Sequence, residues 1–143
     1  AARADPDWAA RIARHRDRRP PDWTTVECAD VAARLRSHPD TATLVDDIGG
    51  WLTAALDRRG WDEGSVAADA DELLTAVSEF RAPLVLVSPE VGLSVVAPSA
   101  AGRRFADELG SLNQRLARCC ESVVLVVAGL AVQVKSQTTE AGS

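Results

Sequence analysis

Short apolar runs alternate with helical patterns along this 143-residue chain, and this alternation constrains the fold more than any other feature. The run at 123–128 is apolar at every position, and the run at 84–88 is broken only by its final serine. Strands without polar residues are buried on both faces, as in a parallel sheet covered by helices. The pattern therefore predicts an α/β fold with a mostly parallel sheet and helices on both faces.

The expected elements follow from apolar spacing and from capping residues. We predict strands at residues 23–27, 42–46, 84–88 and 123–128. We predict helices at residues 6–20, 29–37, 51–59, 65–80 and in a long segment that follows Ser99. With 46% apolar residues, a chain of this length can build one core. We therefore expect a single α/β domain at 1–135 and a flexible polar tail at 136–143.

The charge balance excludes several classes of partner. The chain has 16 Lys and Arg residues against 21 Asp and Glu residues, a formal net charge of −5, so we expect no nucleic-acid partner. No apolar stretch approaches the roughly 20 residues that cross a bilayer, and no signal sequence opens the chain, which indicates a cytoplasmic protein. Cys28, Cys119 and Cys120 form no metal-binding CxxC motif, and we expect them to be small buried side chains.

The densest cluster of functional side chains lies at residues 11–20, where five arginines surround His15. Guanidinium groups bind phosphoryl oxygens in pairs, and a histidine among them can act as a nucleophile that forms a phosphoramidate. The alternative is a solvated arginine face with a packed histidine. His15 shares a helical face with Trp8 and Ile12, which predicts an inward side chain, and this spacing alone favours the packing role.

Carboxylates stand where the predicted strands end, which is the edge that binds ligands in parallel α/β sheets. Asp46 ends an apolar strand and can hold Mg²⁺ that bridges nucleotide phosphates. Asp47 competes for that role, and acids at such positions also cap the following helix. Glu27 can accept hydrogen bonds from a ribose or base, or it can be solvated. The same edge is expected to carry Ser88, Glu90 and Gly129.

Five segments of the chain together resemble one known family in order and spacing. They are HRDRRPPDWTTVE at 15–27, LVDDIGGWLT at 44–53, VSPEVG at 87–92, GRRFADELGSLNQ at 102–114 and LVVAGL at 125–130. The family is the bifunctional adenosylcobinamide kinase/adenosylcobinamide-phosphate guanylyltransferase family of cobalamin biosynthesis. The resemblance covers nearly the whole chain.

This resemblance implies a P-loop NTPase-like fold of the RecA type and a homo-oligomer. It implies an enzyme that phosphorylates adenosylcobinamide and then transfers GMP from GTP to the phosphate, with ATP and GTP as substrates and Mg²⁺ as cofactor. The guanylyl group passes through a covalent histidine, which matches His15. Glu27 would contact the nucleoside and Asp46 the metal ion. The residues implied to line the nucleotide phosphates are Arg16, Asp17, Arg18 and Arg19.

Two departures from the family are visible. Pro89 stands where the family has Asn, and the sequence holds no Gly-x-x-x-x-Gly-Lys-Ser loop, since Lys135 is its single lysine. We therefore expect that the first strand and phosphate loop of such an enzyme are missing from this chain. The alternatives are a noncatalytic nucleotide-binding or assembly subunit, and an unrelated α/β phosphotransferase or hydrolase.

We expect this chain by itself to be inactive as a kinase. In P-loop enzymes the loop amides and lysine hold the β and γ phosphates, and no other segment of this sequence replaces them. Loss of one well-placed donor raises the barrier by about 2.7–4 kcal/mol, so loss of the whole loop should put turnover below detection. The measurement is adenosylcobinamide phosphorylation by this chain and by an extended version with an N-terminal strand and phosphate loop. Comparable rates would contradict the expectation.

Overall fold

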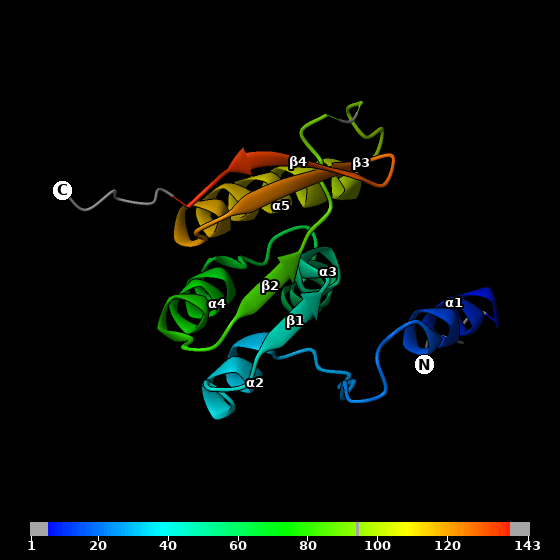
Figure 1. The fold of residues 1–143 in the computed structure, drawn as a ribbon. Coiled ribbons are helices and arrows are strands. Elements are labelled where there is room, and N and C mark those ends of the chain that lie inside the picture. The colour runs from blue at the N-terminus through cyan, green and yellow to red at the C-terminus, as the bar shows by residue number, and fades with distance from the viewer. Residues whose placement is uncertain (1–5, 94, 138–143) are drawn as a thin grey trace.

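The computed structural model describes residues 6–93 and 95–137, except for the side chains of Trp8 and His15. Helices and strands are interspersed along this part of the chain, as Figure 1 shows. The elements are α1 (Pro6–Asp17), α2 (Val31–Ser37), β1 (Thr43–Asp46), α3 (Ile48–Arg59), α4 (Ala67–Glu79), β2 (Leu84–Val87), α5 (Ala100–Cys119), β3 (Val123–Val127) and β4 (Leu130–Lys135). The structure is therefore of the α/β class.

The strands form two separate pairs. β1 and β2 run parallel, with Asp46 opposite Val87 at their carboxyl ends. β3 and β4 form an antiparallel hairpin, and the two residues between them, Ala128 and Gly129, both have positive φ angles, of 51° and 74°. Such a two-residue turn matches the right-handed twist of hairpin strands. Lys135 joins the hairpin to the end of α5, because its Nζ donates to the Ala117 carbonyl at 3.0 Å.

Two of the four strand predictions were wrong in position or in pairing. Residues 23–27 form no strand, and the side chain of Thr25 instead accepts a hydrogen bond from Arg19 at 2.9 Å. Strand propensity is realised only when a neighbouring strand is available. The strand predicted at 123–128 exists as β3, but its partner is the antiparallel β4, which we did not predict. Gly129 between two apolar runs was the signal for that hairpin. Of the predicted tail, residues 138–143 lie outside the described part.

Helices cover only one face of the β1–β2 sheet among the described residues, so the prediction of helices on both faces was wrong. Val45, Leu84 and Leu86 pack against the helical core, while Val85 on the opposite face is 54% exposed. The core itself consists of helix residues and Val66. Its most completely buried large side chains are Leu35, Ile48, Leu52, Leu56, Leu73 and Leu109.

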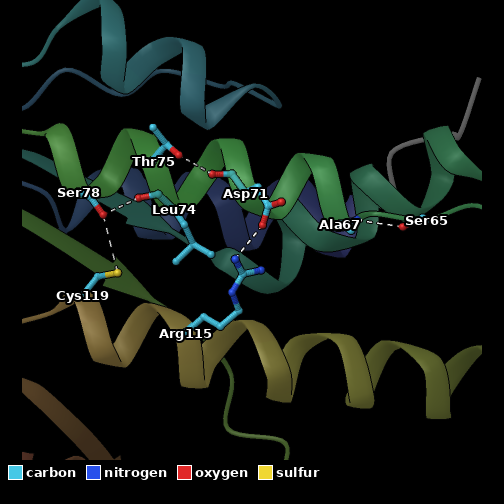
Figure 2. Close-up of polar contacts among 8 residues, drawn as sticks. All are labelled: Ser65, Ala67, Asp71, Leu74, Thr75, Ser78, Arg115 and Cys119. Carbon is cyan, nitrogen blue, oxygen red and sulfur yellow. Dashed lines mark hydrogen bonds and ion pairs between the residues drawn. The ribbon is translucent and has the colours of Figure 1, made fainter.

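Polar side chains join α4 to α5, as Figure 2 shows. Arg115 of α5 donates to the Asp71 carboxylate at 2.7 Å, and the Ser78 hydroxyl lies 3.8 Å from the sulfur of Cys119.

Cys28 and Cys119 are exposed, so the expectation of buried cysteines was wrong for both. Cys120 is half-buried, and this burial raises the pKa of its thiol. No helix in the described ranges is long and apolar enough to span a membrane.

An ion pair between α3 and α4 makes stability depend on pH. Arg59 donates to both carboxylate oxygens of Asp69, at 3.0 and 3.2 Å, and this hydrogen bonding holds the pKa of Asp69 below its ordinary value of 3.8. A lowered folded-state pKa contributes stability that is present above 3.8 and is lost as pH falls through the folded value.

We therefore expect Asp69→Asn to be less stable than the wild type at pH 7, with the difference narrowing as the pH falls below 3.8. The measurement is urea unfolding followed by circular dichroism across this pH range. Asp62→Asn, in the exposed turn after α3, serves as the control. A difference that is independent of pH would show that the ion pair is not its cause.

Candidate functional site

The arginine-rich segment ends helix α1 and turns back toward the sheet. The helix stops at Asp17, since Pro20 and Pro21 follow closely and cannot continue it. The connection from residue 18 to residue 30 then carries the chain to α2 (Figure 1). Nη2 of Arg16, in the last turn of α1, lies 2.7 Å from Oε1 of Glu27 in this connection. Two residues that the sequence assigned separately to the site are therefore in direct contact.

Arg19 links this connection to the carboxyl end of β1. Its Nη1 donates to the Thr25 hydroxyl at 2.9 Å, and its Nη2 lies 3.9 Å from Oδ2 of Asp46. The side chain is 29% exposed and that of Asp46 is 43% exposed, so both groups remain accessible to a ligand. The structure thus brings four of the predicted site residues into two pairs, Arg16 with Glu27 and Arg19 with Asp46.

The two adjacent carboxylates after β1 have different roles. Asp47 is the N-cap of α3, and its carboxylate accepts a hydrogen bond from the amide of Gly50 at 2.7 Å. Asp46 is in the last position of β1 and lies near Arg19 instead. Asp47 therefore takes the helix-capping role, and the carboxylate of Asp46 remains available at the sheet edge.

Among the described side chains, those of Asp17 and Arg18 take no part in these contacts. Asp17 and Arg18 are exposed, and their side chains make no hydrogen bond or ion pair with any residue that the structure describes. His15 is in α1, one residue before Arg16, but its side chain lies outside the described part. Its inward orientation and its role stay predictions.

A second loop reaches the same edge after β2. Ser88 donates to Oδ1 of Asn113 on α5 at 2.6 Å, and Glu90 accepts a hydrogen bond from the amide of Gly92. Sequence reasoning missed Asn113, although it lies within the segment 102–114 that resembles the family. Gly129 lies in the β3–β4 turn, in a different sheet, so its expected place at this edge was wrong.

The described residues fit a magnesium ion only in part. They contain no group of three or more His, Cys, Asp or Glu side chains that could hold a metal ion. Mg²⁺ in nucleotide enzymes is often held by one or two carboxylates together with substrate phosphates and water. An accessible Asp46 fits such a shared site and does not fit a site built from protein ligands alone.

Arg19 and Asp46 meet at the carboxyl end of a parallel strand, the edge at which α/β enzymes bind their ligands. Residues 1–134 match the family model described as cobinamide kinase / cobinamide phosphate guanyltransferase. The chain belongs to this family, whose members are transferases of cobalamin biosynthesis.

Several characterised proteins are similar to this chain. A bifunctional adenosylcobalamin biosynthesis protein, CobU, of Salmonella typhimurium is 35% identical, over 92% of this chain and 80% of the relative. The corresponding protein CobP of Pseudomonas aeruginosa is 38% identical, over 96% of this chain and 80% of the relative. CobU of Escherichia coli is 34% identical, over 92% and 80% respectively.

The two carboxylates after β1 should respond differently to substitution. We expect Asp47→Ala to lower the free energy of unfolding by about 1 kcal/mol, because α3 loses its N-cap. We expect Asp46→Asn to change it by less than about 0.5 kcal/mol, because a half-exposed ion pair at this distance contributes little. Urea unfolding of both variants tests this. Equal destabilisation would show that Asp46 is a structural residue rather than one reserved for a ligand.

Proposed function

We propose that this chain belongs to an enzyme that phosphorylates adenosylcobinamide and transfers GMP from GTP to adenosylcobinamide phosphate, and that it carries the residues for the GMP transfer. We further propose a P-loop NTPase-like fold of the RecA type for that enzyme. The observation that carries the proposal is the contact of Arg19 with Asp46, which links the arginine segment beside His15 to the carboxyl end of a parallel strand.

In the proposed reaction a ring nitrogen of His15 attacks the α-phosphorus of GTP. The bond between this phosphorus and the bridging oxygen breaks, pyrophosphate leaves and a phosphoramidate forms. A phosphate oxygen of adenosylcobinamide phosphate then attacks the same phosphorus. The phosphorus–nitrogen bond breaks, and the histidine is free for another cycle.

The arginines supply positive charge for both steps. A guanidinium group has five N–H donors, and Arg16 uses one of them on Glu27. Arg19 likewise keeps donors beyond its bond to Thr25. The remaining donors can bind phosphoryl oxygens in pairs and stabilise the charge that develops at phosphorus. Arg18 and Asp17, exposed next to them, complete the proposed phosphate-binding segment.

Acidic side chains would contact the rest of the nucleotide. Glu27 is 78% exposed and its second oxygen is available for a ribose hydroxyl or a base N–H. Asp46 would hold Mg²⁺ together with the nucleotide phosphates. The bound ion would neutralise phosphate charge during the transfer. A homo-oligomer, as the family resemblance implies, and a cytoplasmic location, as the sequence indicates, belong to the same proposal.

The test is transfer of label from α-labelled GTP, with Mg²⁺, to the version of the chain extended by a strand and phosphate loop. We expect acid-labile, hydroxylamine-sensitive label on the wild type and none on His15→Ala, because the acceptor nitrogen is lost. Arg19→Ala should lower the labelling rate at least about tenfold, since a charged donor is removed.

His38→Ala is the matched control, because His38 is the second histidine of the chain and bonds Ser37 instead of the arginine segment. It should be labelled like the wild type. Equal labelling of the His15→Ala variant would assign the covalent intermediate to another residue. Absence of label from every version, with GTP still bound, would favour the noncatalytic nucleotide-binding or assembly subunit.

A further inference from the structure

Asn113 uses both ends of its side-chain amide to hold one loop. Its Oδ1 accepts from the Ser88 hydroxyl at 2.6 Å, and its Nδ2 donates to the Pro89 carbonyl at 3.0 Å. One helical turn earlier, Gly110 lies beside Val91: a Cβ atom at that glycine would be at ordinary contact distance, 3.8 Å, from Cγ2 of Val91. One turn of α5 therefore holds the loop that follows β2 through two hydrogen bonds and an apolar contact.

The same loop, at residues 88–92, also packs against the first turn of α3. A Cβ atom placed on Gly49 would lie only 3.1 Å from Cγ and 3.2 Å from Cδ of Pro89. Gly49 itself is buried. The proline ring thus rests directly on the α3 backbone, and Oδ1 of Asp47, which caps this helix, lies 3.4 Å from the same Cβ position. Asp46 immediately precedes this cap.

We propose that Asn113 is a positioning residue for Asp46. By holding Pro89 on the first turn of α3, it fixes the junction between β1 and α3 and with it the direction of the Asp46 carboxylate. The parallel strands β1 and β2 end side by side, with Asp46 opposite Val87. The loop that follows β2 can therefore support the junction that follows β1. The consequence for nucleotide chemistry rests on the proposed function, whereas the mechanical coupling stands on the contacts alone.

The two hydrogen bonds of Asn113 are separable by substitution. Asn113→Asp keeps the acceptor for Ser88 but replaces the donor to Pro89 by a carboxylate oxygen. Ser88→Ala removes the other bond and leaves the one to Pro89. Because Pro89 is the loop residue that lies against Gly49 of α3, the proposal predicts that Asn113→Asp and Asn113→Ala disturb the junction and that Ser88→Ala has little effect on it.

Amide hydrogen exchange of the 143-residue chain tests the coupling without any activity. We expect the amides of Gly50 and Trp51, which bond to Asp47, and those of residues 88 and 90–92 to exchange about tenfold faster in Asn113→Ala and Asn113→Asp, since local opening becomes easier. Gln114→Ala, an exposed neighbour on α5, is the matched control and should exchange like the wild type. Faster exchange confined to residues 88–92 would overturn the proposal, because the loop would then not brace α3.

The Mg²⁺ requirement of GTP labelling provides a second readout, measured with the extended chain. Loss of a residue that orients a metal ligand typically costs about 10–100-fold in metal affinity, so the half-saturating Mg²⁺ concentration should rise at least tenfold in Asn113→Asp. An unchanged requirement in a folded variant would overturn the link to Asp46. If the wild type itself takes no label, the proposed function fails, and hydrogen exchange still decides whether Asn113 positions the junction.

Discussion

Burial of one face of the β1–β2 pair against the helices is the constraint on which the rest of the structure depends. Two strands alone are only marginally stable in water. Here Val45 and Leu86 pack against a core in which Ile48, Leu73 and Leu109 are fully buried. Each such side chain contributes about 1.5–3 kcal/mol when it leaves water. The core therefore fixes the sheet edge at which Asp46 ends β1.

Polar contacts then decide what stands at that edge. Asp47 satisfies the first turn of α3, which leaves the neighbouring Asp46 to face Arg19. Beside it, Asn113 of α5 holds the loop that follows β2. These bonds are few and partly exposed, so each adds little to stability. These bonds matter because they set the orientation of the charged side chains, and catalysis by phosphate-handling enzymes depends on the placement of charged groups.

Much of the fold was predictable, and the errors share one cause. The helix predicted at 51–59 was found, although α3 begins earlier, at Ile48, and the helix after Ser99 was found as predicted, because apolar spacing and capping are local signals. The positions and parallel direction of β1 and β2 were predicted from their apolar runs, without a strand order. Residues 23–27 and the β3–β4 hairpin were mispredicted because strand pairing depends on which partner is available, and a single segment does not carry that information.

The sequence by itself determined the composition of the candidate site: arginines around a histidine, a carboxylate at the end of an apolar strand, and the family to which these segments belong. Only the tertiary structure decided which of them meet. Arg19 reaches Asp46 across 27 residues of chain, and Asn113 reaches Ser88 across 25. Contacts at such separations depend on how helices pack on the sheet, since local propensities act only over a few neighbouring residues.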